Sequence, residues 1–186
     1  ATRYGGLNGS GTIFSLTENG THTVEFEFVN GNLYGQNPGY LTLGANGNIY
    51  FTTEYGGDND YGTLQMFDPS SKTLTKLINL NYSGISGGYP SGQGLVTLPG
   101  NRLAYPINNI SNNSNGGIVI VTLAGSTAGV AHSLLFSNQT LNGYRPNTIV
   151  YNELDGSIYY TSQSGGSNGY GVLGVVTFSG ATAGLG

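Results

Sequence analysis

Hydrophobic positions in this chain fall into short runs separated by glycine, asparagine and other turn-forming residues. In residues 23–28 apolar and polar side chains alternate strictly, which predicts a half-buried strand with Val24, Phe26 and Phe28 on one face and two glutamates on the other. Pairs such as Asn46-Gly47 supply the backbone freedom that tight turns need. No window shows helical periodicity, so the pattern predicts an antiparallel all-β protein.

A glycine-led apolar segment recurs four times along the chain. Its copies begin at Gly11, Gly62, Gly117 and Gly171, which gives successive spacings of 51, 55 and 54 residues. Two other sequence features recur with the same period. One is a turn that leads into a Tyr-bearing strand, and the other is a glycine pair at the end of that strand. Within one copy, strands are expected near residues 40–43, 49–54, 63–67 and 73–78.

A four-stranded unit that repeats at this period is typical of a β-propeller blade. We therefore expect one repeat domain, all-β, with four-stranded antiparallel units and about 3.5 blades. The expected divisions are a part-blade at 1–30, blades at 37–80 and 90–137, and a part-blade at 145–180.

Residues 9–57 carry a set of motifs in a fixed order: Gly9-Ser10-Gly11-Thr12-Ile13-Phe14-Ser15-Leu16, Asn37-Pro38, Gly47-Asn48-Ile49-Tyr50-Phe51-Thr52-Thr53 and Gly56-Gly57. This segment resembles the Gly-rich tandem repeats of secreted and anchored surface proteins that are called GloVer repeats. Later copies keep Pro90 and Pro146 but lose most of the signature. The resemblance implies a propeller-like fold on a secreted or anchored protein, and it carries no catalytic activity.

The composition is poor in charge and rich in uncharged hydrogen-bonding groups. Charged residues make up 8% of the chain, the net charge is -4, and there are 33 glycines, 14 tyrosines and no cysteine. Without a basic stripe, nucleic acid is not expected as a partner. No apolar run is long enough for a membrane span. A surface of this kind favours an extracellular location, secreted or at the cell surface.

Candidate catalytic and metal-binding residues are few. Asp58 and Asp60 stand before a glycine in a segment that loosely resembles a calcium loop, although no acidic residue follows at the required distance, and a structural turn is the preferred interpretation. His22 and His132 lack the partners of a catalytic triad, and the acidic residues suggest no pair. We therefore expect no enzymatic activity, no cofactor and no metal.

Two sets of polar residues are candidates for modification or binding. Tyrosines in or beside the long loops between units could contact a glycan or a protein partner, although packing is the alternative; those chosen are Tyr34, Tyr40, Tyr89 and Tyr144. Glycosylation sequons occur at about the frequency expected by chance in so Asn-rich a chain; they lie at Asn8, Asn19, Asn81, Asn109, Asn112 and Asn138.

The repeat is cut within a unit at both ends of this sequence. Residues 2–6 match the end of a second strand, and the last unit is expected to stop after its third strand, which would leave that strand as a free edge. The sequence therefore predicts an extracellular structural protein that self-assembles into a filament or ring by strand pairing between subunits. Alternatives are a fragment of a longer repeat protein, and a secreted propeller that binds glycans or a surface partner. Candidates for assembly are Gly171, Val172, Leu173, Val175, Val176 and Phe178.

Overall fold

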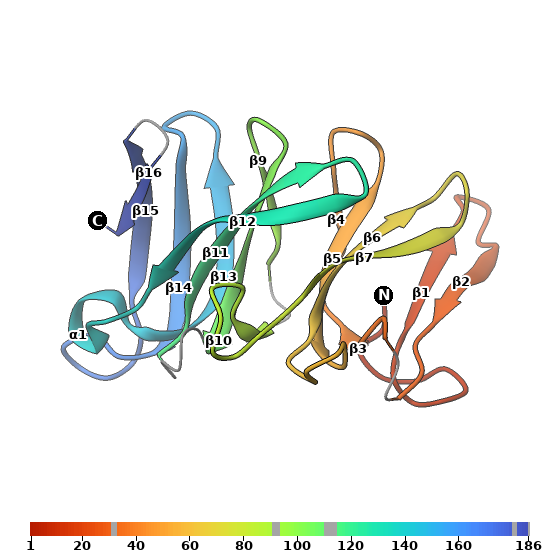
Figure 1. Ribbon diagram of the computed structural model, residues 1–186, viewed down its shortest axis with the longest axis horizontal. Coiled ribbons are helices and arrows are strands. Elements are labelled where there is room, and N and C mark those ends of the chain that lie inside the picture. The colour runs from red at the N-terminus through yellow and green to blue at the C-terminus, as the bar shows by residue number, and fades with distance from the viewer. Residues whose placement is uncertain (31–32, 91–93, 110–114, 180–181, 186) are drawn as a thin grey trace.

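The computed structural model describes residues 1–30, 33–90, 94–109, 115–179 and 182–185 of the chain. Four antiparallel sheets follow one another along the long axis of the molecule, from β1 and β2 at one end to β13–β16 at the other (Figure 1). The sheets correspond to the sequence repeats, and we number them units 1 to 4 in chain order. The prediction of an all-β, propeller-like repeat fold is confirmed.

Units 1 and 2 contain the first seven strands. Unit 1 is the hairpin of β1 (Thr12–Leu16) and β2 (His22–Glu27). Unit 2 has the order β3-β5-β6-β7, with β4 also paired to β5; its strands are β3 (Gln36–Pro38), β4 (Thr42–Leu43), β5 (Ile49–Tyr55), β6 (Thr63–Asp68) and β7 (Thr73–Asn79). The single strand expected near residues 40–43 is thus two short pieces, β3 and β4, that pair with the two ends of β5.

Units 3 and 4 repeat this plan. Unit 3 consists of β8 (Gly88–Pro90), β9 (Val96–Leu98), β10 (Arg102–Asn109), β11 (Gly117–Ala124) and β12 (Thr127–Leu135). Unit 4 consists of β13 (Tyr144–Asn152), β14 (Ser157–Ser164), β15 (Leu173–Ser179) and β16 (Thr182–Leu185). A single turn of helix, α1 (Gln139–Asn142), precedes β13, and its N-cap Asn138 accepts hydrogen bonds from two backbone N–H groups of that turn. One turn is too short to leave a periodic signal in the sequence.

The end of unit 4 corrects the sequence prediction. The third strand, β15, pairs with β14 along one edge and with β16 along the other, so it is an interior strand rather than a free edge. The segment after Ser179 contains small residues without alternation, and for this reason it gave no strand signal. Assembly through an unpaired third strand at this end is therefore excluded.

A glycine with positive φ precedes the third strand of every unit. These glycines are Gly11, Gly62, Gly116 and Gly171, so the third copy begins at Gly116 and not at Gly117. In each case a Cβ atom would lie between 2.2 and 2.5 Å from a carbonyl oxygen, which belongs to the second strand in units 2 to 4 and to Thr2 in unit 1. The position therefore requires glycine for two reasons, its backbone angle and the close approach of another chain segment.

The third strands place their side chains alternately toward the following and the preceding unit. The residue two places after the recurring glycine is the forward residue; the four are Ile13, Leu64, Ile118 and Leu173. The first three pack against the following unit. The residue five places after the glycine lies on the opposite face and is the backward residue; the four are Leu16, Phe67, Val121 and Val176. The last three pack against the preceding unit.

The hydrophobic core is divided among the three junctions between units. Ile13 and Phe67 share one cluster between units 1 and 2. Leu64 and Val121 share the cluster between units 2 and 3, and the third cluster, between units 3 and 4, holds Ile118 with Val176. Units 2 and 3 are thus thin sheets whose two faces are covered by their neighbours, as expected for a repeat architecture, and units 1 and 4 are each covered on one face.

A bulge in unit 1 changes the predicted faces of residues 23–28. The register of β1 and β2 shifts between Ile13 and Phe14, so that Phe26 lies opposite Ile13 whereas Val24 lies opposite Phe14. Phe26 therefore packs toward unit 2, and Val24, 45% exposed, lies on the outer face. The prediction that Val24 shares a face with Phe26 and Phe28 is wrong, because the extra residue of a bulge reverses the alternation.

Backbone hydrogen bonds connect the units at matching places. The N–H groups of Asn37, Tyr89 and Arg145 donate to carbonyls of the preceding unit at 2.8–2.9 Å. Each of these residues stands before a proline and has φ between 52 and 57°. The repeated contact fixes how each unit meets the one before it. Within the described residues, no helix is long and apolar enough to cross a membrane.

Candidate functional site

The outer face of unit 4 is the first feature that could support an interaction. We call it the C-terminal face and define it by Val150, Tyr159, Leu173 and Val175, which the strand register places on the side away from unit 3. Leu173 is 75% exposed and Val150 is 56% exposed. The forward residues of the first three units are at most 2% exposed. A position that is buried at every internal junction is thus open at this end.

Tyr159 and Asp155 add a polar edge to the C-terminal face. The Tyr159 hydroxyl donates to Asp155 Oδ2 at 2.7 Å, which lowers the pKa of Asp155 and raises the pKa of Tyr159. In unit 2 the matching residue is Tyr50, whose hydroxyl accepts a hydrogen bond from Asn46 at 2.9 Å and whose side chain is buried at the junction with unit 3. The tyrosine at this repeat position is therefore buried by the next unit in unit 2, whereas in unit 4 it lies on the outer face of the sheet.

The outer face of unit 1 is the second open face. We call it the N-terminal face and define it by Phe14, Leu16, His22 and Val24. Leu16 is 65% exposed, whereas the backward residues of the other three units are at most 2% exposed. The rings of Phe14 and His22 stack with their centroids 5.0 Å apart. Within the described part of the chain, β1 pairs along its other edge with Thr2 alone.

The assembly candidates predicted from the sequence separate into two groups. Leu173 and Val175 lie on the C-terminal face. Val176 is fully buried against unit 3, and Phe178 lies beneath the Arg102 guanidinium at 5.5 Å, so both stabilise the internal junction. Gly171 and Val172 form the turn before β15, where the Val172 N–H donates to Ser162 Oγ.

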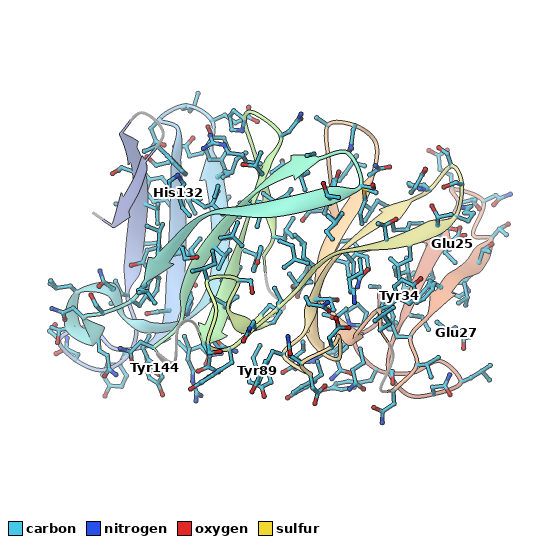
Figure 2. The ribbon with its side chains drawn as sticks, in the orientation of Figure 1. Glu25, Glu27, Tyr34, Tyr89, His132 and Tyr144 are labelled. Atoms are coloured by element: carbon cyan, nitrogen blue, oxygen red, sulfur yellow. The ribbon has the colours of Figure 1, made fainter. Side chains whose placement is uncertain are left out.

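Two of the four predicted tyrosines, Tyr89 and Tyr144, lie along one edge of the molecule (Figure 2). The Tyr89 ring packs edge-on against two other tyrosine rings, at 5.8 Å from Tyr55 and 5.3 Å from Tyr61. Burial raises the pKa of Tyr89, and the neighbouring Glu54 carboxylate raises the pKa of Tyr55.

The other three predicted tyrosines do not form one site with Tyr89. The Tyr34 ring packs on Phe26 at 5.9 Å, and its carbonyl accepts from Gln65 Nε2 at 2.9 Å. Tyr144 carries the Arg145 guanidinium over its ring at 5.3 Å, and Tyr40 is 64% exposed. Tyr34 packs on a ring of unit 1, Tyr40 lies between β3 and β4 of unit 2, and Tyr144 begins β13 of unit 4, so the three do not form one site.

A cavity of about 270 Å³ lies between the turns of units 2 and 3. Buried Tyr50 and Leu103 contribute to its apolar part, and Asn46 and Asn101 contribute polar groups. Sequence reasoning missed this site because Asn46-Gly47 and Gly100-Asn101 were interpreted only as turn formers. Their repetition in neighbouring units was the available signal, since turns that match in two stacked units lie beside one another.

The remaining sequence candidates occupy turns and strand ends. Asp58 pairs with Lys76 at 3.1 Å and accepts from Asn79, and Asp60 accepts from the Gly56 N–H at 2.8 Å, so both carboxylates are used in local structure. Among the sequons, Asn109 is half-buried at the end of β10 and Asn112 lies outside the described residues; the exposed ones are Asn8, Asn19, Asn81 and Asn138.

The row of four antiparallel sheets defines the class of this protein as a β-propeller-like repeat protein. The sequence model of the Gloeobacter/Verrucomicrobia repeat matches residues 1–184, and the chain therefore belongs to that family. No curated protein sequence matches it.

Solved structures with this fold share little sequence with the chain. A gluconolactonase from Xanthomonas campestris has a TM-score of 0.58 and 14% identity over 88% of this chain and 51% of its own. PorZ, a surface component of the type-IX secretion system of Porphyromonas gingivalis, has a TM-score of 0.57 and 12% identity over 90% and 22%. An endo-1,4-β-xylanase from Bacteroides thetaiotaomicron has a TM-score of 0.50 and 13% identity over 88% and 62%. The chain spans about half of the gluconolactonase, and the likeness concerns the fold alone.

Proposed function

We propose that this chain is a non-catalytic structural protein that associates with copies of itself outside the cell, through the open faces at the two ends of its row of units. The observation that carries the proposal is the exposure of Leu173, 75%, at a position where Leu64 and Ile118 are fully buried. Apolar side chains left in water at a face built for packing favour association, because burial removes that area from water. The two faces replace strand pairing at the last unit as the route of assembly.

The absence of catalysis and the extracellular location are supported by different observations. Several acidic side chains form structural ion pairs or hydrogen bonds, such as Glu25 with Lys72 at 2.9 Å. The gluconolactonase and the xylanase of similar fold are 14% and 13% identical to this chain, which gives no basis for transferring their activities. The uncharged surface suits an exterior location. Protease treatment of intact cells tests that location, since digestion of the chain without lysis is expected.

Replacing Leu173 with lysine tests self-association. The wild-type protein should form species larger than a monomer as its concentration rises, and Leu173→Lys should shift them to the monomer, because a charge at the centre of the contact must lose its hydration. Sedimentation velocity measures the shift. Leu154→Lys is the matched control, since Leu154 lies in a turn of the same unit and is 98% exposed. A wild-type protein that stays monomeric at every concentration contradicts the proposal.

The cavity between units 2 and 3 favours a second function, the binding of a small neutral sugar. Its volume of about 270 Å³ and its combination of Tyr50 with Asn46 and Asn101 suit a ring with hydroxyl groups. Glucose should perturb the amide NMR signals of Gly44 and Gly100, which line the cavity. Asn46→Ala should weaken binding by about fivefold, the value of one neutral hydrogen bond. Unchanged amide signals at high glucose concentration would exclude this function.

A further inference from the structure

We infer that copies of this chain join head to tail, with the N-terminal face of one copy on the C-terminal face of the next. This inference rests on the proposed self-association and specifies its geometry. The contact would repeat, between two molecules, the packing that the structure contains between its own units. Each open face is thus covered by a second copy of the chain. The central residues of the contact are Leu173 on one copy and Leu16 on the other.

The internal junctions show which positions meet. At each of them a forward residue of one unit shares a cluster with the backward residue of the next, as Leu64 does with Val121 and Ile118 with Val176. The chain has one exposed forward residue, Leu173, at 75%, and one exposed backward residue, Leu16, at 65%. The C-terminal face therefore carries the forward residue of a junction, and the N-terminal face carries the backward residue. Together the two faces have the residues that meet at an internal junction.

Only the head-to-tail arrangement brings these halves together. Two C-terminal faces in contact would place Leu173 against Leu173, a pairing of forward residues that occurs at none of the three junctions. The contact should be closest over β15, because the N-terminal face is built from β1 and β2, which correspond to the third and fourth strands of a complete unit. Such a contact uses different surfaces on the two partners and leaves one face of each kind open, so further copies can add.

Complementary variants test the orientation. Leu173→Lys blocks the C-terminal face and Leu16→Lys blocks the N-terminal face. Each variant alone should be monomeric, because all its molecules keep the same single face and no molecule offers the face that would bind it. A mixture of equal amounts should give a species of twice the monomer mass and nothing larger, since one free face of each kind then meets. Sedimentation equilibrium measures these masses, and thermal unfolding shows that each variant is folded. Leu7→Lys, at a residue 91% exposed in a turn of unit 1, is the control for charge at that end.

The outcomes separate this inference from the function on which it rests. A monomeric wild-type protein would overturn self-association itself. A wild-type protein that assembles, together with a Leu16→Lys variant that still dimerises alone, would overturn only the head-to-tail geometry and point to contact between two C-terminal faces. The head-to-tail geometry would also be overturned if the two variants stay monomeric when mixed, although each is folded. A dimer that appears only on mixing, with the Leu7→Lys protein assembling as the wild type does, establishes the inference.

Discussion

Leu64→Ala is expected to lower the free energy of unfolding by about 2–5 kcal/mol, the usual range for removing a fully buried leucine side chain. Leu64 is 0% exposed and lies in the cluster between units 2 and 3, together with Leu103 and Val119 from the next unit. The truncation leaves a cavity between two sheets that are each fixed by their own hydrogen bonds, so the site cannot easily collapse. Urea unfolding followed by far-UV circular dichroism measures the loss.

Leu173→Ala is the matched comparison, because Leu173 is the same repeat position in unit 4 and is 75% exposed. In dilute, monomeric protein this substitution should change the free energy of unfolding by less than about 0.5 kcal/mol, as surface substitutions usually do. Similar losses for Leu64→Ala and Leu173→Ala would show that unit 4 is covered in the monomer, and the account of its open face would be wrong. The two substitutions together thus measure how much packing against a following unit stabilises a leucine at this repeat position.

The repeat made most of this fold predictable from the sequence. The recurring glycines and the apolar segments after them gave the period, and the second to fourth strands of unit 2 lie at β5, β6 and β7 within a residue of the expected limits. This works because each strand is short, alternates along its length and is bounded by a turn that needs particular residues. Local chemistry is then enough to locate the strand.

Features that depend on neighbours could not be predicted in this way. The strand β16 has little intrinsic strand preference and forms where β15 offers its free edge. The bulge at Glu25 reverses the faces of β2, and the sequence there contains no glycine or proline that would predict it. The exposed faces of units 1 and 4 were also missed, because the sequence pattern was interpreted for the strand edges of the terminal units and not for the faces of their sheets.

Gly62→Ala is expected to lower the free energy of unfolding by about 2–5 kcal/mol, as the sum of backbone strain at positive φ and the displacement of a packed segment. Gly62 has φ +92°, and a Cβ atom there would lie 2.2 Å from the Thr53 carbonyl oxygen. That oxygen belongs to the end of β5, and the Leu80 N–H donates to the Gly62 carbonyl at 3.0 Å. Neither segment can move without loss to the sheet of unit 2.

Gly47→Ala separates the two contributions to this loss. Gly47 has a similar angle, φ +82°, but a Cβ atom there would meet no atom within 4 Å. Its replacement should therefore cost only the backbone strain, about 1–2 kcal/mol. A Gly62→Ala protein no less stable than Gly47→Ala would mean that the close approach is relieved at little cost. The larger loss of stability expected for Gly62→Ala follows from the contact of its Cβ atom with the Thr53 carbonyl oxygen. The same close approach recurs at the matching glycine of each unit, where the chain turns into the third strand too tightly for any side chain.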